Sequence, residues 1–340
     1  MLTKLLHKTG DFMSGQGAAF LLISAIICGS AIGIRVPQLA DQLPINIDVT
    51  ILLLVFLVLF DVRIQSILSS LNRVAFIIVA LLINFVIIPA LGFGIAYIFL
   101  NNHPLFCIGL VIYFMAPCTD WFLAFTRLAK GNTALGAALL PVNMIVQLLL
   151  YPVYLHIFGI DAIGTDTSSI FNTLRQWFLI PLLIAVAGRL VCERVLREQQ
   201  FAVLQSLVST AIPLLLALLV WQLTVTNIIT LLSHTAVFPL ILAGIILFFV
   251  VTYFLSEAIS KLMKLPYEDR VLLTMTTSAR NAPLMLALTV TVVPDQPIIY
   301  AAIITGMLIE LPHLIALKSV LMLKRNQIEF NCSAPQATSI

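Results

Sequence analysis

Charged side chains are scarce in this sequence. Asp, Glu, Lys and Arg make up only 10% of the 340 residues, whereas they make up about 25% of an ordinary soluble domain. Hydrophobic residues account for 61%, and the mean hydropathy is +1.10. This composition excludes a soluble globular protein and indicates an all-α polytopic protein whose surroundings are a lipid bilayer. The net charge of +3 predicts no nucleic-acid partner, so we expect the basic residues to report membrane topology.

Cysteine is also sparse, and its spacing excludes two common kinds of structural site. The residues form neither the C-x-x-C pairs of a zinc or redox site nor the dense pattern of a disulfide framework. We therefore expect free thiols and predict no metal centre and no cofactor. The cysteines are Cys28, Cys107, Cys118, Cys192 and Cys332.

Catalytic groups are missing at workable spacing. An intramembrane enzyme needs a metal pair, a nucleophile with its base, or paired carboxylates. Asp120 has no acidic counterpart in the matching segment of the second half, and the sequence predicts a protein without enzymatic activity. A membrane sensor that moves no solute stays open as an alternative. The histidines also sit in different segments of the chain; they are His103, His156, His234 and His313.

Ten hydrophobic runs follow one another with short connections. A hydrocarbon layer of about 30 Å is crossed by about 20 helical residues. The first run resembles a signal peptide but lacks a convincing small-residue cleavage site, so we interpret it as a span. The predicted spans are Gly17–Ile34, Asn46–Phe60, Val74–Leu100, Leu105–Leu128, Asn132–Phe158, Ile170–Val191, Phe201–Leu223, Thr235–Ser256, Arg270–Val293 and Pro297–Leu323.

Basic residues are distributed unevenly over the connections between these spans. With the N-terminus inside, all but three of the 18 Lys and Arg residues fall on the inner side. Arg35 and Arg175 fall outside, and Arg280 lies within a span. By the positive-inside rule, we expect both termini in the cytoplasm of a multi-pass protein of the cell (inner) membrane.

The ten spans divide into two halves of five. Because each half has an odd number of spans, two similar halves must have opposite orientations, as in the inverted repeats of secondary transporters. We therefore predict a 5+5 inverted repeat. Its segments are a cytoplasmic N-terminus (1–16), a first repeat (17–158), an external linker (159–169), a second repeat (170–323) and a cytoplasmic tail (324–340).

The fourth and ninth spans interrupt their own helices near the middle. Proline removes a backbone donor, and irregular backbone at this depth is tolerated only against protein or water. We expect the fourth span to break between Met115 and Trp121 and the ninth at 278–283, and the two breaks to cross at a solute site. Simple proline kinks are the alternative. The predicted substrate-binding residues of the breaks are Cys118, Thr119, Asp120, Ser278, Arg280 and Asn281.

The fifth span carries a polar stripe. Asn143, Gln147, Tyr151 and Tyr154 recur at intervals that place them on one helical face. We predict that Asn143 and Gln147 bind substrate. Hydrogen bonds that only join helices are an equally good interpretation.

Three ionisable residues lie inside spans, where charge is costly and a partner is expected. They are Asp120, Arg280 and Glu310. We predict that Arg280 pairs with Asp120 or Glu310, and that Glu310 and Asp120 take part in ion coupling. A purely structural ion pair is the alternative.

The segment Ala116–Phe158 and the stretch Gly306–Pro312 (GMLIELP) together resemble the arsenite permeases of the yeast-type arsenical-resistance family, within the bile acid:sodium symporter superfamily. The similar features are a cysteine-bearing break, a Leu-Ala-Lys-Gly loop, an Asn…Gln…Tyr-x-Val-Tyr span, and a tenth span with Glu and Pro. The resemblance implies a core of spans 3–5 and 8–10 and a panel of spans 1, 2, 6 and 7. It also implies efflux of arsenite or antimonite in exchange for protons, with Cys118 essential.

The ninth span departs from that pattern. Arsenite permeases carry paired asparagines followed by Phe-Glu, and sodium-coupled relatives carry Glu and Gln at their sodium sites, whereas this chain has Arg280 and then Asn281. A guanidinium stays protonated, so it would repel a coupling sodium, take that ion's place, or hold an anionic solute. Symport of an organic anion, with sodium as the coupling ion, therefore remains the alternative to proton-coupled arsenite efflux.

Overall fold

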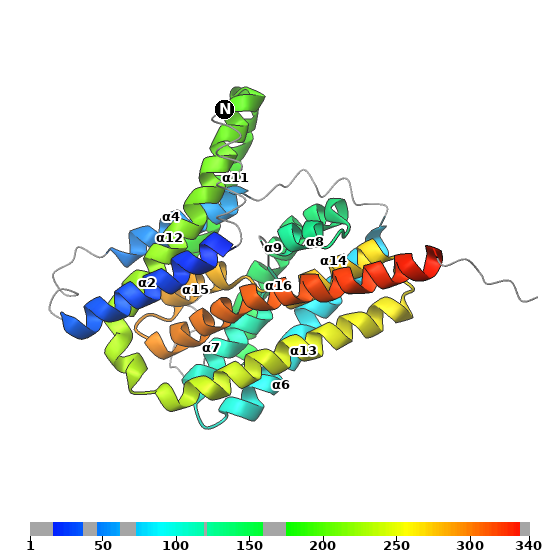
Figure 1. Cartoon of the computed structure of the whole chain (residues 1–340). Coiled ribbons are helices and arrows are strands. Elements are labelled where there is room, and N and C mark those ends of the chain that lie inside the picture. Colours follow the sequence, from blue (N-terminus) through cyan, green and yellow to red (C-terminus); the bar gives the residue numbers. More distant parts are fainter. Residues whose placement is uncertain (1–15, 37–45, 62–72, 119–120, 159–174, 334–340) are drawn as a thin grey trace, which may run out of the picture.

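The computed structural model describes residues 16–36, 46–61, 73–118, 121–158 and 175–333, and within these ranges the chain is helical (Figure 1). The one β-type pairing in this part of the chain is an isolated bridge between Pro117 and Arg280. The first-half elements are α2 (Gln16–Arg35), α4 (Ile47–Asp61), α5 (Val74–Leu82), the π-helix η2 (Ile83–Ile87), α6 (Ile88–Leu100), α7 (Pro104–Met115), α8 (Trp121–Leu128) and α9 (Thr133–Ile157). The second-half elements are the π-helix η4 (Arg175–Leu179), α11 (Ile180–Val195), α12 (Glu198–Leu232), the 3-10 turn η5 (Thr235–Val237), α13 (Phe238–Leu262), α14 (Tyr267–Ser278), α15 (Ala282–Val292) and α16 (Pro297–Ser333).

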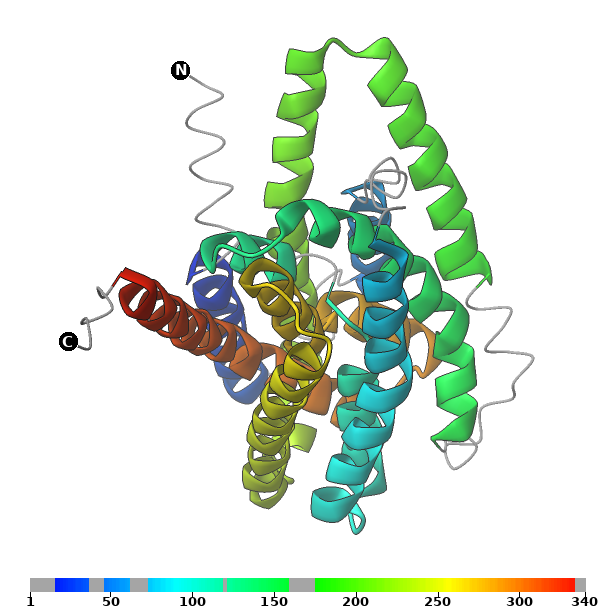
Figure 2. The same cartoon turned by 90° about the vertical axis from the view of Figure 1, so that its right-hand side faces the viewer.

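Helices α2, α4, α11 and α12 pack on one another. In Figure 2, α11 and α12 form a hairpin that extends beyond the other helices. Small residues allow α2 to lie close to α12, because a Cβ on Gly33 would sit 2.5 Å from the Val225 carbonyl oxygen. Close backbone approach of this kind is how helices associate without a hydrophobic driving force in lipid.

A second group of helices surrounds α7. Helix α7 contacts both α6 and α16, and α13 packs on both α6 and α14. Glycines again permit the contacts: a Cβ on Gly109 would meet the Ile299 carbonyl oxygen at 2.5 Å, and one on Gly306 would meet the Tyr113 ring at 2.6 Å. The ring of Tyr113 therefore lies directly against the backbone of α16.

Several of these helices are suited to a bilayer. Among the described residues, five helices are long and apolar enough to cross a membrane, and shorter apolar helices include Pro104–Met115 and Ala282–Val292. Large hydrophobic side chains cover the outside, among them Leu262 at 84% exposure and Phe20 at 72%. An apolar exterior of this kind marks a surface that faces lipid. The protein is an integral membrane protein.

The two predicted interruptions are confirmed. Helix α7 ends at Met115 and α8 begins at Trp121, while α14 ends at Ser278 and α15 begins at Ala282. Other bounds differ from the prediction: α16 continues to Ser333, past the expected end at Leu323, and an ion pair from Lys324 to Glu257 of α13 holds that extension. The predicted external linker (159–169), and the terminal residues 1–15 and 334–340, lie outside the described residues.

Candidate functional site at the crossing of two broken helices

The two interruptions pair with each other through their backbones. The Cys118 N–H donates to the Ala279 carbonyl at 3.0 Å, and the Asn281 N–H donates to the Ala116 carbonyl at 3.0 Å. Pro117, which has no N–H, stands opposite Arg280 in the bridge. Each break thus provides hydrogen-bond partners for backbone groups of the other. Irregular backbone at membrane depth needs such partners, because no water is present to replace them.

Three half-helix ends of the described residues meet at this crossing. Helices α7 and α14 direct their last carbonyls toward it, while α15 begins there with N–H groups; helix C-termini carry partial negative charge and N-termini partial positive charge. Asn281 caps α15, because its side-chain oxygen accepts from the Leu284 N–H at 3.4 Å. The arrangement places donors and acceptors around one point.

The guanidinium of Arg280 lies at the carbonyl ends of α7 and α14. The side chain is fully buried, and Nη1 donates to the Phe114 carbonyl of α7 at 3.0 Å. Nη2 donates to two carbonyls in the last turn of α14, those of Thr276 (3.1 Å) and Thr277 (2.6 Å). The face of the Phe248 ring lies 5.7 Å from the guanidinium carbon. Nε has no hydrogen-bond partner.

Glu310 reaches the same point from α16. Its Oε1 accepts from the backbone N–H of Arg280 at 2.9 Å, and its Oε2 accepts from the Tyr113 hydroxyl at 3.3 Å. Glu310 thus connects the break at Arg280 with the Tyr113 hydroxyl of α7. The structure therefore brings Glu310 to the backbone of Arg280, whereas an ion pair between the two side chains stays a prediction.

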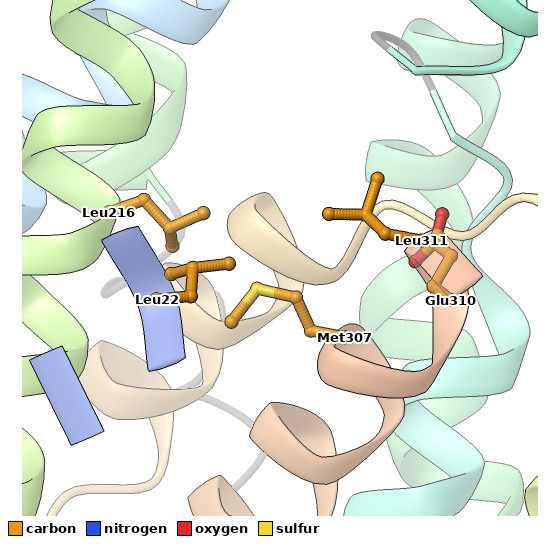
Figure 3. A pocket seen from close by; sticks show the side chains of 5 residues that line it. All are labelled: Leu22, Leu216, Met307, Glu310 and Leu311. Carbon is orange, nitrogen blue, oxygen red and sulfur yellow. The ribbon is translucent and has the colours of Figure 1, made fainter. Parts of the chain in front are cut away.

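A small cavity lies beside Glu310 (Figure 3). Leu22 of α2 and Leu216 of α12 face Met307, Glu310 and Leu311 of α16 across it. Its volume is about 10 Å³, and a water molecule needs about that much space. The carboxylate thus lies where the helices around α12 meet those around α7.

A cluster of buried amides lies next to the crossing. Asn84 and Asn143 both donate to the Thr276 hydroxyl, at 3.1 and 3.4 Å. Asn84 belongs to the π-helix η2, and π-helices occur frequently at functional sites. Among the described residues, the buried oxygens that have no hydrogen-bond partner include Asn84 Oδ1, Asn143 Oδ1, Gln147 Oε1 and Ser278 Oγ. Buried acceptors of this kind are normally paired, so they are suited to a ligand that donates hydrogen bonds.

The predicted site residues are placed as follows. Cys118, Arg280 and Asn281 lie at the crossing, with Ser278 at the end of α14. The four residues of the stripe on α9 are all buried. Tyr151 pairs with Thr289 and Tyr154 donates to the Phe85 carbonyl, whereas the side-chain oxygens of Asn143 and Gln147 have no hydrogen-bond partner. Thr119 and Asp120 lie outside the described residues, so pairing of Asp120 with Arg280 stays a prediction.

Sequence reasoning missed two members of this site. Asn84 is the one amide residue in the hydrophobic run Val74–Leu100, and that isolation was the available signal. Tyr113 gave no signal, because an aromatic residue in an apolar helix is unremarkable until its hydroxyl is seen to donate to Glu310.

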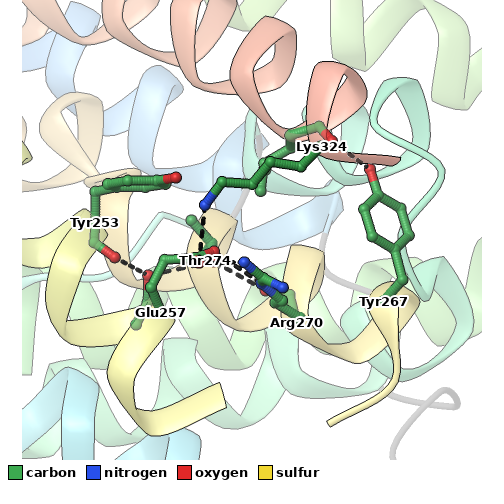
Figure 4. A network of polar contacts seen from close by, with 8 residues as sticks. Tyr253, Glu257, Tyr267, Arg270, Thr274 and Lys324 are labelled. Carbon is green, nitrogen blue, oxygen red and sulfur yellow. Dashed lines mark hydrogen bonds and ion pairs between the residues drawn. The ribbon is translucent and has the colours of Figure 1, made fainter. Parts of the chain in front are cut away.

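A second polar network lies away from the crossing and joins α13, α14 and α16 (Figure 4). Arg270 makes two hydrogen bonds to the Glu257 carboxylate, and Lys324 reaches the same carboxylate at 2.9 Å. The hydroxyl of Tyr267 donates to the Leu321 and Ala129 carbonyls, each at 3.1 Å. This network fixes the start of α14 against the far end of α16.

Comparison with known proteins agrees with this architecture. The model of the Sodium Bile acid symporter family matches residues 49–234, which is more than half of the chain. The chain belongs to this family.

Two relatives of this symporter-family chain are named Arsenical-resistance protein Acr3. The one from Corynebacterium glutamicum is 26% identical over 253 residues, covering 70% of this chain and 68% of the relative. The one from Alkaliphilus metalliredigens is 23% identical over 338 residues, covering 90% and 93%. A Bacillus subtilis protein named Uncharacterized sodium-dependent transporter YocS is 25% identical over 115 residues, covering 34% and 35%. The two longer matches support the arsenite permease branch of the superfamily, as the motif resemblance predicted.

Proposed function

We propose that the protein is a secondary active transporter that exports arsenite or antimonite in exchange for protons. The observation that carries this proposal is the position of Cys118, whose backbone N–H joins the two breaks and whose side chain is buried. Thiolates are soft ligands and suit soft centres such as trivalent arsenic. Similarity to two proteins named for arsenical resistance supports the same substrate.

The substrate site that we propose combines this thiol with hydrogen-bond acceptors. Undissociated arsenite carries three hydroxyl groups, and the unpaired amide oxygens of Asn143 and Gln147 and the Ser278 hydroxyl oxygen lie buried near the crossing. We add Asn84, whose oxygen is equally unpaired. The proposed set is Cys118, Thr119, Asp120, Asn143, Gln147, Ser278, Arg280 and Asn281, together with Asn84.

Glu310 is the proton carrier in this proposal, with Asp120 as a second carboxylate. Two features support Glu310: its contact with the Arg280 backbone, and its place beside the cavity formed with α2 and α12. Protonation removes the negative charge that balances the Arg280 guanidinium, so the two protonation states differ in the forces at the crossing. Movement of one group of helices against the other would then follow the state of Glu310.

The architecture that we propose for transport is ten spans in a 5+5 inverted repeat with both termini cytoplasmic. The contacts of α2, α4, α11 and α12 with one another support a panel of spans 1, 2, 6 and 7. The packing of α6, α7, α13, α14, α15 and α16 supports a core of spans 3–5 and 8–10. Rocking of core against panel is the motion that this division favours.

Symport of an organic anion is the second candidate, and the buried Arg280 guanidinium is the observation that favours it. The geometry argues against this use of Arg280, because both terminal nitrogens already donate to carbonyls and only Nε is unpaired. An anion would have to displace those bonds. Arsenite, a neutral molecule at pH 7, needs no such displacement.

Flux measurements in proteoliposomes test the proposed function. Arsenite, antimonite and a set of carboxylate anions are offered to the reconstituted full-length protein, with proton and sodium gradients imposed separately. We expect arsenite and antimonite flux that follows the proton gradient. Flux of carboxylates alone, driven by sodium, would overturn the proposal.

A further inference from the structure

Three main-chain carbonyls from two different half-helices converge on one side chain. The carbonyl of Phe114 belongs to the last turn of α7, and those of Thr276 and Thr277 belong to the last turn of α14. Carbonyls at half-helix C-termini are the groups that hold coupling cations in transporters with broken helices. In this protein they accept hydrogen bonds from Arg280.

The surroundings complete a site for positive charge. The carboxylate of Glu310 lies against the Arg280 backbone, and the ring face of Phe248 lies 5.7 Å from the guanidinium. Ring faces and carboxylates both attract cations. The C-terminal ends of α7 and α14 add their partial negative charges at the same place. Every one of these features is suited to a cation, and the guanidinium is already there.

The residues do not fit a mobile sodium ion at this point. The carbonyls that would coordinate it are bonded to the guanidinium, which stays protonated. A second positive charge beside it would be repelled strongly, because Arg280 is fully buried and shielded from water. The name of the family refers to sodium, whereas this chain has a guanidinium bonded to the carbonyls that would coordinate that ion.

We propose that Arg280 is a tethered cation, which occupies the cation position at the crossing of the two broken helices and makes the protein independent of sodium. This inference rests on the proposed function only in that it leaves protons as the coupling ion. Because the charge is covalently attached, the crossing is held together in every state of the transport cycle. No ion has to bind before the two breaks can pair.

Thermal unfolding of the purified full-length protein tests this proposal without any transport assay. Wild type is compared in NaCl, KCl and choline chloride at equal concentration. The variant Arg280→Ala is then titrated with guanidinium chloride at millimolar concentrations, below those that denature proteins. Arg127→Ala, which removes an exposed arginine from α8, is the matched control.

We expect wild type to unfold at the same Tm in all three salts. We expect Arg280→Ala to unfold at a lower Tm, and free guanidinium to raise that Tm by at least ~2 °C in a saturable way. Wild type and Arg127→Ala should show no such rise. A sodium-specific stabilisation of wild type, or an Arg280→Ala protein that does not respond to guanidinium, would overturn the proposal.

A second pair of variants covers the case in which Arg280→Ala does not fold. Arg280→Lys keeps a cation at the crossing, whereas Arg280→Gln has similar length and no charge. A tethered cation requires the Lys variant to be the more thermostable of the two. Equal stability, or a more stable Gln variant, would contradict it. Because these readouts involve no arsenite, they are independent of the substrate assignment.

Discussion

The pairing of Arg280 with Glu310 can be tested by a double-mutant cycle. Arg280→Gln removes a cation that donates to three main-chain carbonyls, in a residue whose backbone N–H donates to the Glu310 carboxylate. One Gln amide cannot reach carbonyls on both α7 and α14, so some acceptors stay unpaired. Removing one member of a buried charge pair costs about 3–5 kcal/mol, since the remaining charge is left buried without compensation.

The second substitution separates charge from packing. Glu310→Gln in the Arg280→Gln background removes the uncompensated carboxylate but keeps an oxygen that can accept from the backbone N–H at position 280. We therefore expect the double variant to regain about 1–3 kcal/mol relative to Arg280→Gln alone. Carbonyls that accept from Arg280 in the wild type stay unpaired in both the single and the double variant, so the stability is recovered only in part.

The assay is reversible unfolding of the purified protein in mixed micelles, followed by tryptophan fluorescence. All four proteins of the cycle are measured in the same detergent and salt. Their free energies of unfolding are compared at the same fraction of denaturing detergent in the micelles. A double variant that is no more stable than Arg280→Gln would refute the pairing of Arg280 with Glu310. Asp120 would then be the next partner to test by the same cycle.

Three further predictions follow from the site and the topology. Cys118→Ser should abolish arsenite transport without loss of expression. Cys107→Ser, which removes a buried thiol of α7, should transport normally. Wild-type arsenite resistance in the Cys118 variant would show that the thiol takes no part in the mechanism. A cysteine placed at Thr165 should react with an impermeant thiol reagent in intact cells, and labelling only after lysis would reverse the proposed orientation. Glu257→Gln should destabilise the protein by about 1–3 kcal/mol, because it weakens the contacts of Arg270 and Lys324; an unchanged Tm would show that this partly exposed network contributes little.

The sequence was most informative where local chemistry decides the structure. Proline with no N–H, in an otherwise apolar run, predicts where a helix must stop, and α7 ends at Met115 as expected. The polar stripe on α9 followed from helical periodicity and is buried as one face.

Contacts between distant segments were less accessible. Nothing local to Glu310 indicates that its carboxylate accepts from the backbone of Arg280, because that contact depends on how α16 packs against the break. The π-helix around Asn84 was not predicted either. Pro89, which has no N–H, lies just after it at the start of α6, but a proline in a helical run predicts a kink and does not specify the type of turn that forms.

The proposed transport cycle requires that arsenite moves through the crossing in exchange for protons. The most direct test is to reconstitute the protein into vesicles that contain a pH-sensitive dye and then to add arsenite outside. We predict that the internal pH rises as arsenite enters, because protons leave in exchange. The rise should require no sodium and should be absent in Cys118→Ser vesicles. Arsenite entry without proton movement, or the same pH change in the Cys118→Ser protein, would contradict the account.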